Sequence, residues 1–239
     1  MSLTIALKAV DGLVLAADSR VTEGYTLQGP KIRDDSVKFI QMGENFGILT
    51  YGLSDIGNAA IVSLKEEIES NSKGDTSLSF ILERGTNVFD AKSTDWARTN
   101  PGIKRRDKDT GFIIGGYDRE DKDFKIFNFQ SPDFSPKMVE SGCLLAGQWH
   151  IAKFFTGRLY TGRGMPIEKA RDLAVFLLNA TMAVEKTVGG TIRVATITEP
   201  NGFQWISEDE VNAVIKKNSA FSRFFQEQLY SSLLRVMDS

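Results

Sequence analysis

Residues 1–20 read MSLTIALKAVDGLVLAADSR, two short apolar runs joined by an aspartate and a glycine. The runs, 3–10 and 13–17, are rich in the β-branched and small residues that fit a buried sheet. Asp11-Gly12 between them is a strong signal for a two-residue hairpin, because both central positions of a type I′ turn need a positive φ. The stretch therefore predicts a β-hairpin whose first strand begins almost at the first residue.

The geometry of this hairpin gathers reactive groups at one strand end. With the turn centred on Asp11 and Gly12, cross-strand partners have numbers that add to about 23, so Ser2 faces Val21 and has Ser19 as a diagonal neighbour. A hydroxyl and the N-terminal amine then lie beside the carboxylate and the cation of the DSR stretch. An amine with a pKa of about 8 can act as a base at neutral pH, and a hydroxyl paired with it is a known form of nucleophilic catalysis. The alternative is a plain edge hairpin with an incidental serine.

Composition excludes several other classes of function. The 239 residues are 41% hydrophobic and 25% charged, which is ordinary for a soluble domain. The net charge of −2 gives no electrostatic case for binding nucleic acid or an anionic membrane. One cysteine, Cys143, and one histidine, His150, allow neither an internal disulfide nor a zinc site built on several such ligands. We expect no metal and no cofactor.

The chain carries no apolar run of the roughly 20 residues that a membrane-spanning helix needs. Its start also lacks the basic region of a signal peptide, and charged residues interrupt the apolar pattern. We therefore expect a cytoplasmic protein with its N-terminus intact apart from removal of Met1.

Apolar periodicity predicts an alternation of strand groups and helix pairs. The expected strands after the first hairpin are 36–42, 46–51, 110–117, 123–129, 137–146 and 191–198. The expected helices are about 55–70, 76–98, 148–161 and 166–186, with a polar, basic loop at 99–109 and a long helical tail at about 207–237. Helices grouped in pairs between strand groups favour antiparallel sheets flanked by helix layers over an alternating βαβ sheet. We expect one domain, with its C-terminal tail as an appended helix.

Three stretches together carry a family resemblance: TIALKAVDGLVLAADSRVTEG, SVKFIQM and GILTYGLSDIG. They resemble a proteasome β-subunit or one of its bacterial or archaeal homologues, all N-terminal-nucleophile (Ntn) hydrolases of the threonine protease family. The family places an aspartate sixteen residues after its nucleophile, and a glycine fourteen residues after a lysine on the next strand. Asp18 lies sixteen residues after Ser2, and Gly52 lies fourteen residues after Lys38. The resemblance implies a four-layer αββα sandwich over residues 2–206, with a C-terminal helical extension over 207–239.

The resemblance also implies a role for each matching residue. Ser2 would be the nucleophile once Met1 is removed, with its own α-amine as general base. Lys38 would lower the effective pKa of the hydroxyl, and Asp18 would orient Lys38. Gly52 would donate its backbone N–H to the oxyanion. Unaided by the resemblance, a structural salt bridge is the more ordinary role for such a pair as Asp18 and Lys38, and Gly52 is alternatively a simple strand terminator.

Five further positions match the family's substrate contacts. Thr22 aligns with the position whose backbone binds an extended peptide. The pocket for the residue before the scissile bond would be lined by small or apolar side chains, which predicts a modest apolar pocket. These side chains are Val21, Ser36, Ile40 and Thr50. Val21 and Ile40 are alternatively ordinary core residues.

The sequence departs from the family pattern at three positions. Gln148 stands where the family has a serine, Glu185 stands for an aspartate, and Val188 replaces a second serine, although Gly189 and Gly190 remain. The loss of a hydroxyl at Val188 removes a hydrogen bond to the amine of the nucleophile. These changes leave the expected nucleophile, base and oxyanion donor in place.

The function implied is a self-compartmentalising peptidase that uses Ser2 and assembles with copies of itself into stacked rings, acting on peptides or unfolded proteins. An ATP-dependent unfoldase partner is left open. One alternative is a catalytically silent, ring-forming scaffold subunit, which the changes at Gln148 and Val188 motivate. Another is an amidase or peptide ligase that works through the same acyl-enzyme.

Overall fold

Two five-stranded antiparallel sheets form the centre of the structure. It is a computed structural model that describes residues 2–26, 29–71, 77–102 and 109–219, without the side chains of residues 23–30 and 71. The first sheet runs in the order β10 (Cys143–Gly147), β1 (Leu3–Lys8), β2 (Leu13–Ala17), β11 (Arg193–Thr198) and β12 (Gly202–Trp205). The second runs in the order β5 (Phe39–Met42), β6 (Phe46–Gly52), β7 (Thr110–Asp118), β8 (Asp123–Gln130) and β9 (Lys137–Met138).

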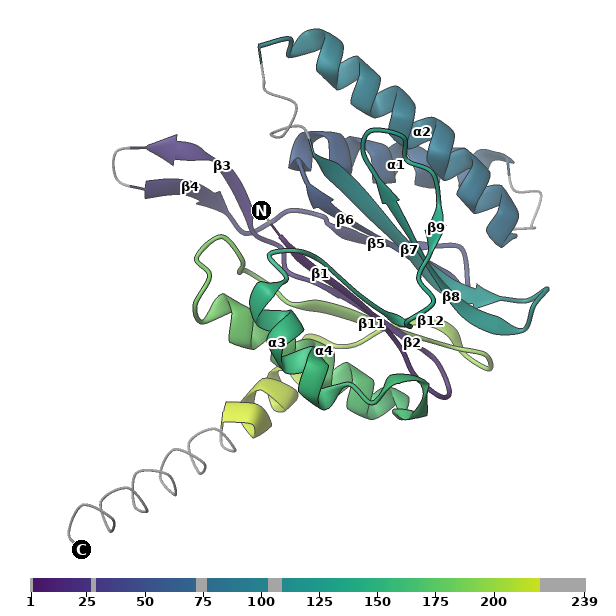
Figure 1. The fold of residues 1–239 in the computed structure, drawn as a ribbon, viewed down its shortest axis with the longest axis vertical. Coiled ribbons are helices and arrows are strands. Elements are labelled where there is room, and N and C mark those ends of the chain that lie inside the picture. Colours follow the sequence, from purple (N-terminus) through teal and green to yellow (C-terminus); the bar gives the residue numbers. More distant parts are fainter. Residues whose placement is uncertain (1, 27–28, 72–76, 103–108, 220–239) are drawn as a thin grey trace, which may run out of the picture.

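A pair of helices accompanies each sheet. Helices α1 (Ser54–Asn71) and α2 (Leu78–Thr99) cover the second sheet, and α3 (His150–Leu159) and α4 (Ile167–Met182) cover the first (Figure 1). The expected α+β class, with antiparallel sheets and paired helices, is confirmed. The paired helices follow from the apolar spacing of their sequences, and α2 is additionally capped by the Ser77 hydroxyl, which accepts from the Phe80 N–H.

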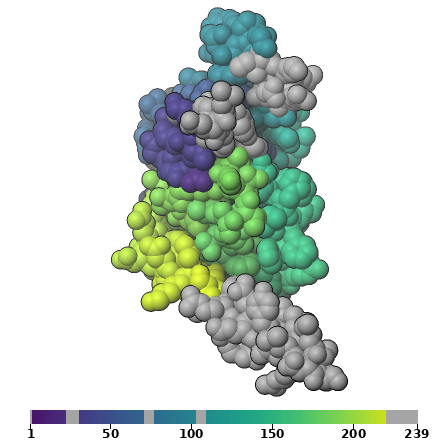
Figure 2. Space-filling view, turned by 90° about the vertical axis from the view of Figure 1, so that its left-hand side faces the viewer, coloured from purple at the N-terminus to yellow at the C-terminus, as the bar shows by residue number. Residues whose placement is uncertain are grey.

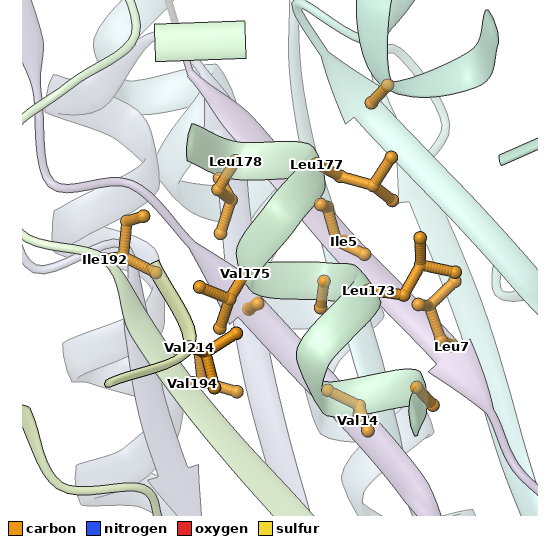
Figure 3. Close-up of a cluster of buried hydrophobic side chains, with 14 of the residues drawn as sticks. Ile5, Leu7, Val14, Leu173, Val175, Leu177, Leu178, Ile192, Val194 and Val214 are labelled. Carbon is orange, nitrogen blue, oxygen red and sulfur yellow. The ribbon is translucent and has the colours of Figure 1, made fainter. Parts of the chain in front are cut away.

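Three buried clusters hold these elements together. One lies between the sheets and includes Leu15, Phe39 and Ile113. A second joins β1, β2 and β11 to α4, with Ile5, Val14 and Val194 facing Leu173 and Val175 (Figure 3). A third joins the second sheet to α1 and α2 around the stacked rings of Phe89 and Phe112. Strand β11 contributes to two clusters, which confirms the burial on both faces that its apolar sequence predicts.

The turn of the first hairpin differs from the prediction. The observed partners Thr4–Ala17 and Lys8–Leu13 have numbers that add to 21, so the predicted register is wrong by two residues. Tertiary contacts decide the turn: the Val10 N–H donates to the Met165 carbonyl at 2.9 Å, and the Asp11 carboxylate accepts from the Ile167 N–H at 2.9 Å. Residue 2 consequently lies opposite position 19, closer to Asp18 than the predicted register places it.

One hairpin was not predicted. β3 (Val21–Thr26) and β4 (Gly29–Arg33) form a two-stranded sheet that projects from the main body (Figure 1). Its sequence lacks clean apolar alternation, and its pairing shifts between Thr22 and Gly24, so the two-residue period is broken. The single strand expected at 137–146 is in fact split into β9 and β10.

The start of the C-terminal tail packs on its own domain. Residues 208–219 are helical, and Val211 and Val214 are buried in the cluster of the first sheet and α4. Val214 lies beside Val194 (Figure 3). The predicted helix from 220 onward and the basic triplet at 104–106 lie outside the described residues.

Candidate active site

Asp18 lies at the centre of the predicted site. Its side chain has no exposed surface and accepts hydrogen bonds from three backbone N–H groups. The donors are Leu3 N at 2.9 Å, Arg20 N at 3.1 Å and Gly189 N at 3.1 Å. The Leu3 bond ties the carboxylate to the residue that directly follows Ser2. A buried carboxylate surrounded by N–H donors is held in one orientation.

Lys38 completes this cluster with a buried ammonium. Its Nζ lies 3.0 Å from both carboxylate oxygens of Asp18 and also donates to the Arg20 carbonyl. The Lys38 side chain is 4% exposed. Burial lowers the pKa of Lys38 below its ordinary value, and the charge of Asp18 acts in the opposite direction. The structure thus brings together the predicted pair in a site nearly closed to water.

Ser2 is buried next to this pair, immediately before β1. Its carbonyl accepts from the Gln148 N–H at 2.7 Å. Gly147 approaches so closely that a Cβ there would lie 1.9 Å from the Ser2 carbonyl oxygen, and its φ of +83° also favours glycine. Pairing with β10 therefore fixes the backbone at residue 2. The sequence analysis singled out the side chain of Gln148, but the contact with Ser2 is made by its backbone N–H.

Gly52 ends β6 at the same end of the second sheet as Lys38. The Thr50 N–H donates to the Lys38 carbonyl at 2.9 Å, and Gly52 follows two residues later. Gly52 is exposed, has a φ of +90°, and has no room for a Cβ, which would lie 2.2 Å from the Asp109 carbonyl oxygen. These features require glycine and leave its backbone accessible.

Glu185 opens the loop that reaches Asp18. Its carboxylate accepts from the Thr187 N–H at 3.0 Å and the Thr187 hydroxyl at 2.7 Å, and these bonds hold its pKa below the ordinary value. Val188 is fully buried in the cluster of the first sheet and α4. Gly189 then presents its N–H to Asp18. Glu185 thus shapes the loop, and Val188 anchors the loop by apolar packing.

The predicted substrate residues fall into two groups. Val21 and Thr22 lie at the base of the β3–β4 hairpin, where they pair with Arg33 and Ile32. The others lie near α1: Ile40 and Thr50 are on β5 and β6, and Ser36 comes just before β5. The Thr50 hydroxyl donates to the Gly111 carbonyl at 3.3 Å. The Ser36 N–H donates to the Ser19 carbonyl at 3.1 Å, which links the two groups beside Asp18.

The sequence analysis missed several contributing residues. The hairpin geometry placed the Arg20 cation at this strand end but gave it no partner, and the backbone donors at Leu3 and Gly189 were not predicted. Asn58 was also missed: its Nδ2 donates to the Ser36 hydroxyl at 3.3 Å, and its buried Oδ1 has no hydrogen-bond partner among the described residues. Asn58 therefore adds an amide beside positions expected to form a modest apolar pocket.

The described ranges contain no group of three or more His, Cys, Asp or Glu side chains arranged to hold a metal ion. In the same part of the chain, none of the helices combines the length and apolar character needed to cross a membrane.

Solved structures identify the fold. An Anbu structure from Pseudomonas aeruginosa, reported as a helical assembly of the Anbu complex, superposes with a TM-score of 0.71 at 19% identity and covers 95% of this chain and 96% of that one. The chain shares the fold of the Anbu proteins. Anbu from Hyphomicrobium sp. strain MC1 gives 0.70 at 19% identity, with coverage of 95% and 96%. Anbu from Yersinia bercovieri, described as an ancestral β-subunit, gives 0.68 at 16% identity, with coverage of 94% and 96%.

These comparisons correct the family expected from the sequence. The similar structures described above are Anbu proteins, so the identification as a proteasome β-subunit-like hydrolase is wrong. Neither a protein-family model nor a curated protein sequence matches the chain. At 16–19% identity the structural likeness establishes the fold alone.

Proposed function

We propose that this chain is a self-assembling peptidase whose nucleophile is the hydroxyl of Ser2. In this proposal residues 2–206 form a four-layer αββα domain with Ntn chemistry, and residues 207–239 form a helical extension. The α-amine of Ser2, free after removal of Met1, serves as the general base. Peptides or unfolded proteins are the substrates.

The buried Asp18–Lys38 pair carries the proposal. Burying two charges costs several kcal/mol per ion, and the attraction between them does little more than offset this cost. A buried ion pair is therefore weak evidence of a purely stabilising role. Asp18 of this pair accepts from the N–H of Leu3, the residue directly after the buried Ser2. A fixed positive charge beside a hydroxyl favours its ionised form. Perturbed, desolvated titratable groups concentrate at functional sites.

The proposed reaction is acyl transfer to Ser2. Its Oγ forms a bond to the scissile carbonyl carbon, and the hydroxyl proton passes to the α-amine, directly or through a water. The Gly52 N–H donates to the resulting oxyanion, for which its exposed position at the end of β6 is suited. The C–N bond then breaks, and the leaving amine takes the proton. Water hydrolyses the ester that remains and restores the hydroxyl.

Assembly with further copies is the second part of the proposal. The Anbu complex of Pseudomonas aeruginosa is a helical assembly, and this chain shares that fold. Large apolar side chains are also exposed on α3, at Ile151, Phe154 and Leu159, which suits a protein contact. We expect a homo-oligomer, in stacked rings or in an open helical arrangement. Light scattering coupled to size exclusion measures its mass.

A silent scaffold is the competing function, and Val188 favours it. Its complete burial leaves an apolar side chain where a second hydroxyl was expected to support the amine of the nucleophile. A scaffold would keep the fold and the oligomer but would need neither a free amine at Ser2 nor a reactive hydroxyl.

Intact mass spectrometry separates the two functions. The peptidase requires the mass of the chain without Met1. It also requires that a peptide epoxyketone add its whole mass at residue 2, because the hydroxyl adds to the ketone and the amine opens the epoxide without a leaving group. Ser2→Ala removes the adduct, whereas Ser79→Ala, on the exposed face of α2, leaves it unchanged. A retained Met1 or an unmodified Ser2 contradicts the peptidase and leaves the scaffold.

A further inference from the structure

One arginine connects two distant parts of the chain beside the proposed site. Arg20 Nε and Nη2 lie 2.7 and 2.8 Å from the two carboxylate oxygens of Asp34. A third nitrogen, Nη1, donates to the Lys186 carbonyl at 3.0 Å. The planar guanidinium suits such fixed, two-pronged contacts, which a lysine cannot reproduce. We name this bridge the Arg20–Asp34 pair.

The Arg20–Asp34 pair packs against the segment that contains Gly189 and Gly190. A Cβ at Gly189 would lie 2.4 Å from the guanidinium carbon, and one at Gly190 would lie 3.0 Å from the Asp34 Cβ. The Ser19 hydroxyl adds a second link, since it donates to the Asp34 carbonyl at 2.6 Å and accepts from the Thr191 N–H at 2.8 Å. N-terminal and later residues, purple and green, also meet on this face of the molecule (Figure 2).

The same residue touches both members of the buried ion pair. The Arg20 N–H donates to Asp18 at 3.1 Å, and the Arg20 carbonyl accepts from the Lys38 ammonium. The Gly189 N–H, on the segment that the guanidinium holds, donates to the same Asp18 oxygen as Arg20. A displacement of Arg20 therefore moves one backbone donor of Asp18 directly and a second through Gly189.

We propose that the Arg20–Asp34 pair is a positioning element that sets the orientation of Asp18 and Lys38 toward Ser2. The inference rests on the proposed function, because it assigns the pair a role in that reaction. Neither side chain touches the reacting atoms. The hydrogen bond from Arg20 holds the pKa of Asp34 below its ordinary value, so the carboxylate is charged at neutral pH. The half-exposed position of Asp34 makes the pair removable without opening the core.

Asp34→Asn tests the inference in the full-length chain. The variant keeps the shape of the side chain and loses one acceptor and the charge. Misplacement of catalytic groups by about 1 Å costs up to about 100-fold in rate. We expect the maximal rate of epoxyketone adduct formation at Ser2 to fall about tenfold, with the half-saturating probe concentration unchanged. Asp34→Glu restores most of the rate, and Arg20→Lys behaves like Asp34→Asn.

Asp95→Asn is the matched control, because Asp95 forms an exposed ion pair with Arg98 on α2. We expect this variant to form the adduct at the wild-type rate. A wild-type maximal rate in Asp34→Asn overturns the positioning role and leaves the proposed function standing. Loss of reactive protein without loss of maximal rate also overturns it, because that result indicates a purely structural pair. If Asp34→Asn does not fold, the test uses Asp34→Glu and Arg20→Lys. A wild-type maximal rate in folded Arg20→Lys then decides against the role. An unreactive wild-type Ser2 overturns both proposals.

Discussion

Among the described residues, two lysine–aspartate pairs link the two sheets; both lysines are buried, and the pairs differ in the exposure and the donor set of the aspartate. Lys8, at the end of β1, lies 2.6 Å from Asp123 at the start of β8, and the Asp123 side chain is 50% exposed. Asp18 and Lys38 lie 3.0 Å apart with side chains 0% and 4% exposed. Asp18 additionally holds three backbone donors.

The difference shows that the burial of the carboxylate and its donor set, rather than residue type, distinguish a candidate catalytic pair from an ion pair with a half-exposed carboxylate. Water reaches the half-exposed Asp123 carboxylate and screens its attraction to Lys8, so the Lys8–Asp123 pair contributes little to the stability of the fold. Water does not reach Asp18, so each of its partners is needed to offset the cost of burial.

Removal of Lys38 has the largest expected effect. Lys38→Ala leaves the Asp18 carboxylate buried without its counter-charge, which costs about 3–5 kcal/mol in the free energy of unfolding. We also expect the Ser2 adduct to disappear. Urea denaturation measures the first effect, and intact mass measures the second. A folded Lys38→Ala protein that reacts at the wild-type rate would exclude a catalytic role for the ammonium.

Gly189→Ala comes next, because a Cβ there would lie 2.4 Å from the Arg20 guanidinium carbon. Displacing the Gly189 N–H from Asp18 costs about 1–3 kcal/mol, as overpacking does elsewhere. We expect the adduct to form about tenfold more slowly, because the Gly189 N–H is displaced from Asp18. This effect is smaller than that of Lys38→Ala, in which the adduct is expected to disappear. Gly157→Ala on α3, where nothing lies within 4 Å of the added Cβ, is the control. It should react normally and gain about 0.5–1 kcal/mol.

Lys8→Ala tests the other side of the comparison. The ion pair, with its half-exposed carboxylate, contributes no more than about 1 kcal/mol, and the loss of the buried Lys8 stem adds a packing cost to this. Adduct formation at Ser2 should not change, because Lys8 lies at the opposite end of β1 from Ser2. Chemical denaturation and intact mass provide both readings. A slower adduct in a fully folded Lys8→Ala variant would mean that the two ends of the strand are coupled.

The smallest expected effect is a pH dependence of the Lys8 pair. Partial burial acts to raise the pKa of Asp123, and the Lys8 ammonium outweighs it, so the folded-state pKa is lowered. A lowered carboxyl pKa gives stability above the ordinary value of about 3.9, and this is lost as the pH falls through the folded-state value. The stability difference between wild type and Asp123→Asn should shrink by under about 1 kcal/mol between pH 7 and pH 3. A difference that grows on acidification contradicts the assignment.

Local patterns in the sequence predicted most of the fold. Apolar spacing placed the helices over 55–70 and 166–186 close to the observed α1 and α4. The turn after β1 could not be predicted in this way, because its carboxylate, Asp11, is held by a residue 156 positions away. Asp11-Gly12 has the composition of a type I′ turn, but the chain follows the partners that it finds in the folded state.

Sequence spacing also brought Ser2, Asp18 and Lys38 together, through a resemblance that named the wrong family. The remaining donors of the site were invisible to sequence analysis because they are backbone N–H groups, which almost every residue carries. Only the folded geometry selects Leu3 and Gly189 for Asp18. The sequence placed the Arg20 cation at this strand end, but not its partners, because Asp34 and Lys186 have no characteristic spacing from it.

The hydrogen bond between Gly189 and Asp18 spans 171 positions of the chain. During synthesis, the Asp18 carboxylate therefore lacks one of its donors until nearly four-fifths of the polypeptide has been made. Contacts this distant in sequence are slow to form, because the intervening chain must be ordered before they are gained. A truncated or partly folded chain consequently cannot have the complete site, which ties the chemistry proposed for Ser2 to the finished fold.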